Sequence, residues 1–176
     1  GYVIIFPIFF ITMEEHIMNE VLVLFSGGKD SFYLTLLMIE KGYNVNLVTY
    51  ENGCGLKSSN ALKTASRIQK KYGNNRVKIL GIKKTDAIYR QFLYLFYNLK
   101  PSEIFRNYGE VTISQFNCLA CRLAMYVISI ILCTKMNINL VVDGARKSQL
   151  FAIEQEPLLH KFKSFFKTYN IEIEYP

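Results

Sequence analysis

A six-residue segment, 26–31 (Ser-Gly-Gly-Lys-Asp-Ser), combines residue types that bind phosphate. Two adjacent glycines allow backbone angles that other residues avoid, so successive N–H groups can point at one anion. The serine hydroxyls add hydrogen-bond donors, and Lys29 adds a positive charge. Asp30 would repel a phosphate unless it held a divalent cation such as Mg²⁺. A strand-to-helix turn without a ligand is the simpler alternative, but it requires neither the serines nor the acid.

The elements around this segment must place it at the edge of a sheet. Residues 21–25 are all apolar, as expected of a strand buried on both faces, and residues 31–41 have helical spacing. The N-terminus of that helix would add about half a positive charge at the loop. Strands and helices continue to alternate along the chain. The further expected strands are 45–50, 77–82, 138–142 and 171–175, and the further expected helices run from Ser58 or Ser59 to Tyr72 and over 86–97, 118–136 and 157–169.

This order predicts βαβ units with right-handed crossovers. The expected fold class is therefore α/β, a Rossmann-like parallel sheet of about five strands with helices on both faces. The helix that contains residues 89–99 is apolar nearly all round. Such a helix is expected to be fully buried, with a dimer contact as the second choice.

Segment 26–31 is neither a Walker A loop nor a G-x-G-x-x-G motif. It resembles the SGGxDS signature of the PP-loop (N-type) ATP pyrophosphatases, which have a Rossmann-like fold of the adenine nucleotide alpha hydrolase type. Members split ATP between the α and β phosphates and adenylate an acceptor oxygen. The resemblance implies that ATP and Mg²⁺ bind here, that Asp30 holds the metal, and that Thr49 and Tyr50 lie near the adenine or ribose. The residues that the resemblance assigns to the pyrophosphate and its metal are Ser26, Gly27, Gly28, Asp30 and Ser31. Lys29 is counted with them for its charge, and Lys29 and Asp30 are the candidate catalytic residues of the loop.

A second candidate segment, 142–149, follows the expected fourth strand. The carboxyl ends of parallel strands meet at one edge of a sheet, so this segment is expected beside Ser26. The family resemblance assigns Asp143 and Gly144 to nucleotide binding. Arg146 is a candidate catalytic residue because its charge could stabilise the leaving pyrophosphate. The segment departs from the GHNxDD pattern of tRNA thiolases, and an ordinary basic surface loop is the alternative.

The cysteines offer a separate candidate site. Cys118 and Cys121 form a C-x-x-C pair at the expected start of a helix, where thiol pKa values are lowered. The pair could bind Zn²⁺ or an iron–sulfur cluster, act as a catalytic pair in sulfur transfer, or be buried core. Cys54 follows the second strand and could be a third metal ligand, whereas Cys133 is expected in the core. Several tRNA-thiolating PP-loop enzymes resemble this arrangement, but their third cysteine comes later in the chain, and here none follows Cys133.

Composition sets the broad class. The chain has 176 residues, of which 51% are apolar, so it can bury a core without disulfides. No secretion signal is present, which predicts a cytoplasmic protein with reduced thiols. The net charge of +7 suits an anionic partner such as a nucleotide or RNA, or simply solubility.

One expected helix carries a basic stripe, which is interpreted either as an RNA contact or as a solvated face. Its residues are Lys63, Arg67, Lys70 and Lys71.

Two domain assignments follow. Residues 1–17 form an apolar extension that is too short to span a membrane, so no membrane partner is expected. The extension is interpreted as non-native sequence from an early start site, with an added edge strand or a dimer contact as alternatives. Residues 18–176 form the ATP-binding PP-loop domain. Because the chain ends on an expected strand, this domain is either pared down or lacks a C-terminal part.

These features together predict an enzyme that adenylates a substrate with release of pyrophosphate. The favoured substrate is a tRNA base that is then thiolated, with a sulfur-donor protein as a further partner and a homodimer as an open alternative. The first competing hypothesis is a small-molecule ligase of the 7-cyano-7-deazaguanine synthase or amide-forming type. That synthase family carries a C-terminal four-cysteine zinc cluster, which this sequence lacks. The second is a nucleotide-binding subunit without catalysis.

Overall fold

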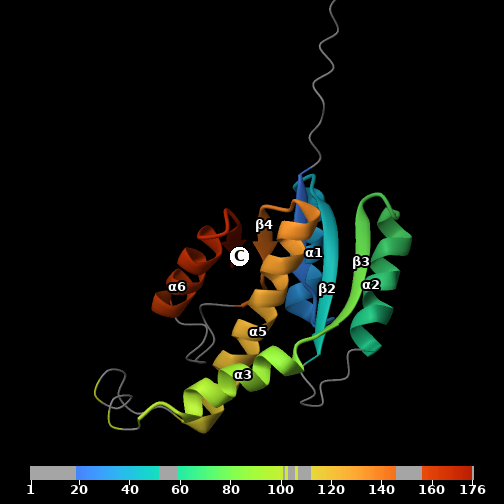
Figure 1. The fold of residues 1–176 in the computed structure, drawn as a ribbon. Helices are drawn as coiled ribbons and strands as arrows, with labels where there is room; N and C mark the ends of the chain where they lie inside the picture. The colour runs from blue at the N-terminus through green and yellow to red at the C-terminus, as the bar shows by residue number, and fades with distance from the viewer. Residues whose placement is uncertain are drawn as a thin grey trace, which may run out of the picture.

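The computed structural model describes residues 19–51, 59–100, 102, 106, 112–145 and 156–175. Strands and helices alternate through these residues (Figure 1). Segment 1–17, Cys54 and Arg146 lie outside the described residues. In chain order the elements are β1 (Glu20–Leu24), α1 (Lys29–Glu40), β2 (Asn44–Glu51), α2 (Ser59–Tyr72), β3 (Val77–Lys84), α3 (Asp86–Tyr97), α5 (Ile113–Met136), β4 (Leu140–Val142), α6 (Glu156–Lys167) and β5 (Glu172–Glu174).

The five strands form one parallel sheet in the order β3-β2-β1-β4-β5. Along the chain, the sheet first grows from β1 to β3 in one direction and then from β4 to β5 in the other. The direction of growth reverses between β1 and β4, which makes this pair the topological switch point. In open parallel sheets, ligands bind beyond the carboxyl ends of the strands at such a point. The predicted fold class is confirmed.

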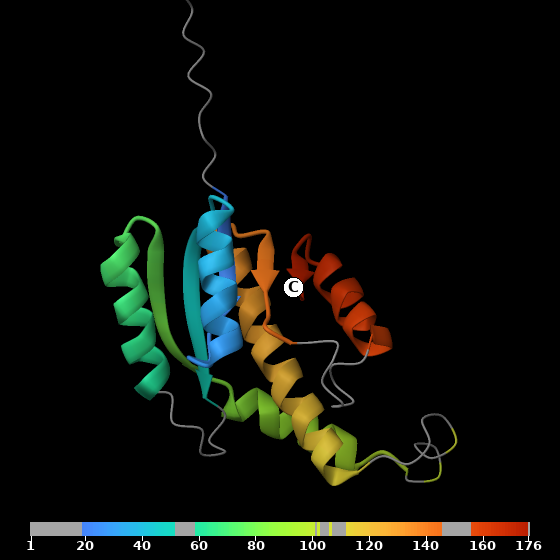
Figure 2. The same cartoon turned by 180° about the vertical axis from the view of Figure 1, so that it is seen from behind.

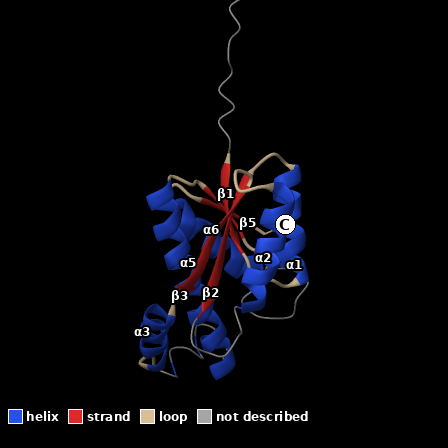
Figure 3. Ribbon diagram, turned by 90° about the vertical axis from the view of Figure 1, so that its right-hand side faces the viewer, coloured by secondary structure: helices blue, strands red, loops and turns tan. Residues whose placement is uncertain are grey.

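Helices cover both faces of the sheet (Figure 3). Val21 and Val23 of β1 pack into a cluster with α1 and α2, whereas Leu22 and Leu24 pack into a second cluster with α5 and α6. Successive strand residues point to opposite faces, so β1 must be apolar at every position to fill both clusters. Each fully buried Val or Leu contributes about 1.5–3 kcal/mol. Burial on both faces thus holds β1 in the middle of the domain, and with it the starting point of the loop that follows.

One expected helix boundary is wrong and affects the cysteines. The helix expected to begin at Cys118 begins at Ile113. Thr112 and Gln115 form a capping box: the Gln115 N–H donates to Thr112 Oγ1 over 3.3 Å, and the Thr112 N–H donates to Gln115 Oε1 over 2.7 Å. Cys118 therefore lies beyond the first turn, where the effect of the helix dipole has faded. The predicted place of Cys118 at the helix N-terminus is therefore wrong.

The expected burial of the apolar helix is also wrong. No described residue of α3 is buried, and Tyr94, Leu95 and Tyr97 are 71%, 58% and 56% exposed. The helix packs on one side against the start of α5, where the rings of Phe96 and Phe116 stack 5.4 Å apart. Together the two helix ends project from the body of the domain (Figure 2). Apolar composition predicted burial, but within the described ranges α3 packs mainly against α5. The dimer contact stays a prediction.

Helix α5 is the one described helix that is long and apolar enough to cross a membrane by length and composition alone. In the structure it lies against the sheet, with Ala120, Ala124 and Tyr126 buried. It also carries Arg122, which is ion-paired to Asp143 of the sheet edge. These contacts are those of a core helix in an α/β domain.

Candidate functional site

The loop after β1 is shaped by Gly27. Its φ of +78° lies in the left-handed region that side chains disfavour. A Cβ on this residue would lie 2.6 Å from Ala61 Cα of α2, closer than any real contact. The loop therefore rests against the first turn of α2, and only glycine fits there.

The loop leads directly into the N-terminus of α1. Gly28 is the N-cap residue, and among the described residues no side chain caps the helix. Gly28, Lys29 and Asp30 are exposed at this end. The first N–H groups of a helix have no partner within the helix, and here they face the open edge of the sheet. Such an end binds anions.

Two serines hold the shape of the loop. The Ser26 and Ser31 hydroxyls share a hydrogen bond of 3.2 Å. The Ser31 hydroxyl also lies 3.1 Å from the Gly28 carbonyl, to which it donates, and the Gly28 N–H donates to Ser26 Oγ over 3.3 Å. Ser26 is exposed, whereas Ser31 is buried. Ser26 is thus open to a ligand, and Ser31 supports the loop from within.

The segment after β4 meets the loop, as the sequence predicted. A Cβ placed on Gly144 would lie 3.6 Å from Asp30 Cβ and 3.6 Å from the Ser31 backbone nitrogen. Gly144 therefore lies against the first turn of α1. The switch point is lined on one side by the loop of β1 and on the other by the turn of β4.

The two residues expected near the nucleoside have different surroundings. Thr49 is buried, and its hydroxyl donates to the Phe25 carbonyl over 2.9 Å, which ties the end of β2 to the base of the loop. The Tyr50 hydroxyl instead bonds Ser129 Oγ of α5 over 2.7 Å. Burial raises the pKa of Tyr50, so this phenol stays protonated. Its hydroxyl is directed to α5, away from the loop, and the nucleoside contacts of both residues stay predictions.

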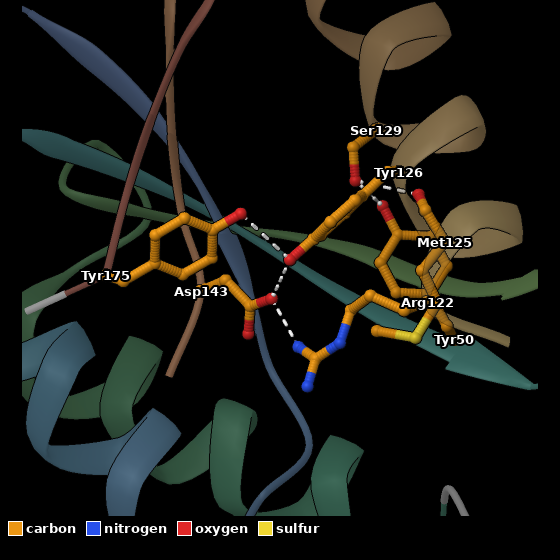
Figure 4. A network of polar contacts seen from close by, with 7 residues as sticks. All are labelled: Tyr50, Arg122, Met125, Tyr126, Ser129, Asp143 and Tyr175. Carbon is orange, nitrogen blue, oxygen red and sulfur yellow. Dashed lines mark hydrogen bonds and ion pairs between the residues drawn. The ribbon is translucent and has the colours of Figure 1, made fainter. Parts of the chain in front are cut away.

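Asp143 is the centre of a polar network that joins the sheet to α5 (Figure 4). Its Oδ2 atom accepts hydrogen bonds from the Arg122 guanidinium and, over 2.7 Å, from the Tyr126 hydroxyl. The Tyr126 and Tyr175 hydroxyls lie 3.2 Å apart. Burial, and then the charge of Asp143, raises the pKa of Tyr126, so that tyrosine remains a donor. The family resemblance assigns Asp143 to nucleotide binding, and that role stays a prediction; in the structure its carboxylate contacts residues of α5.

Arg122 and Tyr126 are site residues that sequence reasoning missed. The signal available in the sequence is a charge in the middle of an apolar helix, because an arginine in such a place needs a buried acidic partner. The partner lies 21 positions away in the chain, and only the fold identifies it.

The thiols of α5 differ in exposure. Cys118 is exposed, Cys121 is intermediate and Cys133 is buried. Within the described ranges, which exclude Cys54, no group of three or more His, Cys, Asp or Glu side chains could hold a metal ion. Zinc or an iron–sulfur cluster at Cys54, Cys118 and Cys121 therefore stays a prediction.

Burial makes Cys133 unreactive. It raises the pKa of this thiol to about 12, so the thiolate nucleophile is scarce at pH 8. We expect iodoacetamide to modify Cys118 within minutes at pH 8 and to leave Cys133 unmodified until the protein unfolds. Peptide mass spectrometry with and without urea measures this. Equal labelling of both residues in the folded protein would contradict the burial of Cys133.

Comparison with protein-family models shows the family to which this chain belongs. Residues 20–148 match the model of the family described as queuosine biosynthesis protein QueC. The matched residues include both the loop after β1 and the turn after β4. The chain belongs to the QueC family. Membership of QueC confirms the PP-loop superfamily that the loop sequence predicted. No curated protein matches the chain.

Two solved structures are similar to this chain. The predicted subunit of a tRNA methyltransferase from Methanocaldococcus jannaschii is 21% identical, with a TM-score of 0.53 over 90% of this chain and 67% of that one. An NH3-dependent NAD synthetase from Campylobacter jejuni is 19% identical, with a TM-score of 0.46 over 76% of this chain. The chain spans about half (49%) of that synthetase. At such identities the first match shows a shared fold alone.

Proposed function

We propose that this protein binds ATP at the switch point and transfers the adenylyl group to an oxygen of an acceptor, with release of pyrophosphate. The observation that carries the proposal is the uncapped N-terminus of α1, where Gly27 is packed against α2 and Gly144 against Asp30 and Ser31. The N–H groups at this exposed helix end are the proposed phosphate ligands, and we call this end the phosphate cradle. Membership of the QueC family, within the PP-loop superfamily, supports ATP as the anion.

Different residues of the loop would bind different parts of ATP and its metal ion. The first N–H groups of α1 and the Ser26 hydroxyl would hold the β and γ phosphates, and Lys29 would add charge. The Asp30 carboxylate, exposed beside them, suits a hard cation, and Mg²⁺ bound there would neutralise phosphate charge. The acceptor oxygen then bonds to the α phosphorus while the bond to the bridging oxygen breaks, and pyrophosphate leaves with that oxygen. Positioning and charge stabilisation account for such catalysis.

Membership of the QueC family favours a small molecule as the acceptor of the adenylyl group. A ligase like 7-cyano-7-deazaguanine synthase must turn a carboxylate into a nitrile, so both carboxylate oxygens must be activated and lost. Ammonia displaces the first activated oxygen and gives an amide, and the amide oxygen leaves after a second activation to give the nitrile. Adenylation supplies that activation. We therefore place a 7-deazapurine carboxylate first among acceptors for this site.

A tRNA base that becomes thiolated is the second candidate acceptor. One observation favours it: Cys121 directly precedes Arg122, which reaches Asp143 at the site, so the C-x-x-C pair lies next to the site on α5. The exposed basic face of α2, whose first turn touches the loop, would suit tRNA phosphates. The residues of this face are Lys63, Arg67, Lys70 and Lys71.

Labelled ATP tests the reaction. The protein is incubated with Mg²⁺ and ATP labelled at the γ phosphate, alone, with a 7-deazapurine carboxylate and an ammonium salt, or with bulk tRNA. Labelled pyrophosphate formed only with the carboxylate supports the small-molecule ligase, and pyrophosphate formed only with tRNA supports base modification. Labelled inorganic phosphate would contradict α–β cleavage. Binding of ATP without turnover would support a non-catalytic subunit instead.

A further inference from the structure

Arg122 reaches the nucleotide site from the opposite face of the sheet. Helix α5 packs in the cluster on one face, whereas α1 and its loop pack in the cluster on the other. At the carboxyl edge, the Arg122 guanidinium meets Asp143, and these side chains are only 14% and 7% exposed (Figure 4). Removing one partner of such a buried pair leaves an uncompensated charge, which is strongly unfavourable.

The pair is connected to the phosphate cradle through the backbone of the turn after β4. Asp143 precedes Gly144, the residue that lies against Asp30 and Ser31. Both hydrogen bonds from α5 fall on one oxygen, Oδ2, so they fix the direction of the carboxylate as well as its charge. The Asp143 N–H is held as well, because it donates to the Glu174 carbonyl over 3.0 Å. A negative carboxylate in this place without its guanidinium would repel a bound triphosphate.

We propose that Arg122 is a positioning residue of the nucleotide site. It holds Asp143 so that Gly144 stays against the N-terminus of α1, and it cancels the negative charge of Asp143 beside the phosphates. Tyr126 supports the same carboxylate by its hydroxyl. This inference rests on the proposed function, because it concerns the site at which ATP would bind. An ordinary structural ion pair is the competing account.

If Arg122 acts by compensating the charge of Asp143, its loss should affect ATP more than AMP, whereas a purely structural role should affect both equally. Arg122→Met leaves Asp143 uncompensated, so ATP should bind at least about tenfold more weakly, which is about 1.4 kcal/mol. AMP, which lacks the β and γ phosphates, should lose less than about threefold. Adding Asp143→Asn removes the stray charge, so the double variant should recover ATP affinity to within about threefold of the wild type. Arg122→Lys keeps the charge and should fall between the wild type and Arg122→Met.

The experiment measures the Kd for ATP and for AMP by calorimetry in Mg²⁺, together with thermal unfolding of each variant. Arg90→Met is the matched control, because Arg90 pairs with Asp86 in an exposed i,i+4 contact within α3, and it should bind ATP as the wild type does. If Arg122→Met does not fold, Arg122→Lys and the neutral double variant still give the comparison.

Three outcomes overturn the inference. Unchanged ATP affinity in Arg122→Met would do so, as would an equal loss for ATP and AMP, which indicates general loss of structure. A double variant that folds but binds ATP as weakly as Arg122→Met would show that charge compensation is not the reason. Wild-type protein that binds no ATP contradicts the proposed function itself, and the inference falls with it, so the two failures are distinguishable.

Discussion

Gly27→Ala is expected to abolish ATP binding and to lower the free energy of unfolding by about 3 kcal/mol. Two effects add. A residue with a Cβ at a φ of +78° costs about 1–2 kcal/mol, and an added methyl in a filled space costs about 1–3 kcal/mol. The Cβ would lie 2.6 Å from Ala61 Cα, and backbone cannot move aside as a side chain can. The loop must leave α2, and the N–H cradle opens. Urea unfolding and ATP calorimetry measure the two effects.

Gly28→Ala is the matched control for folding. Gly28 has a φ of −78°, which any residue adopts, and its Cβ would meet only the Ser26 hydroxyl at 3.4 Å. We expect its unfolding free energy to stay within about 1 kcal/mol of the wild type. If Gly27→Ala were as stable as Gly28→Ala, the packing of the loop on α2 would be incorrect.

Asp30→Asn is expected to reduce pyrophosphate release by at least about 100-fold and to remove the Mg²⁺ dependence of ATP binding. The amide keeps the size of the side chain but loses the charge that attracts a hard cation. ATP affinity is measured with and without Mg²⁺, and turnover across a Mg²⁺ series. The loss of turnover should persist at saturating ATP, because the change affects charge neutralisation during the reaction.

Asp86→Asn provides the comparison for Asp30. Asp86 also lies in the first turn of a helix, but that helix is α3, which is not at the switch point. Its replacement should cost the helix-dipole contribution of about 0.3–1 kcal/mol and the exposed i,i+4 pair with Arg90, about 0.3–0.5 kcal/mol, and should leave Mg²⁺-dependent binding intact. Mg²⁺-dependent ATP binding that survives in Asp30→Asn would contradict the assigned role of Asp30.

The sequence predicts the order of elements well because the signals are local. A buried strand is predicted by the all-apolar run 21–25. A phosphate loop is predicted by the glycines at 27 and 28, and the end of the next helix by the glycine at 42. The meeting of the loop with the turn after β4 was also predictable, because parallel strands in a doubly wound sheet place their carboxyl ends at one edge. The position of Gly144 against Asp30 and Ser31 agrees with that rule.

Other features depend on contacts that no local pattern contains. The apolar sequence of α3 predicted burial, but whether a helix is covered depends on how many neighbours the fold supplies. The start of α5 was misplaced because the capping box of Thr112 and Gln115 was overlooked, although it can be recognised in sequence. The partner of Arg122 follows from the insertion of β4 beside β1, which brings Asp143 to α5. Long-range pairing, rather than propensity, decides these cases.

The neighbouring positions of β1 and β4 have a consequence for biogenesis. Four described helices and two described strands separate these two strands in the chain, so a nascent chain holds only the β1 side of the cradle until β4 has been synthesised and has inserted beside β1. Contacts between segments so distant in the chain form late in assembly, because closing the loop costs entropy before the contacts are made. A nucleotide that bound only the completed edge would stabilise the folded chain, and this stabilisation would grow with the logarithm of its concentration.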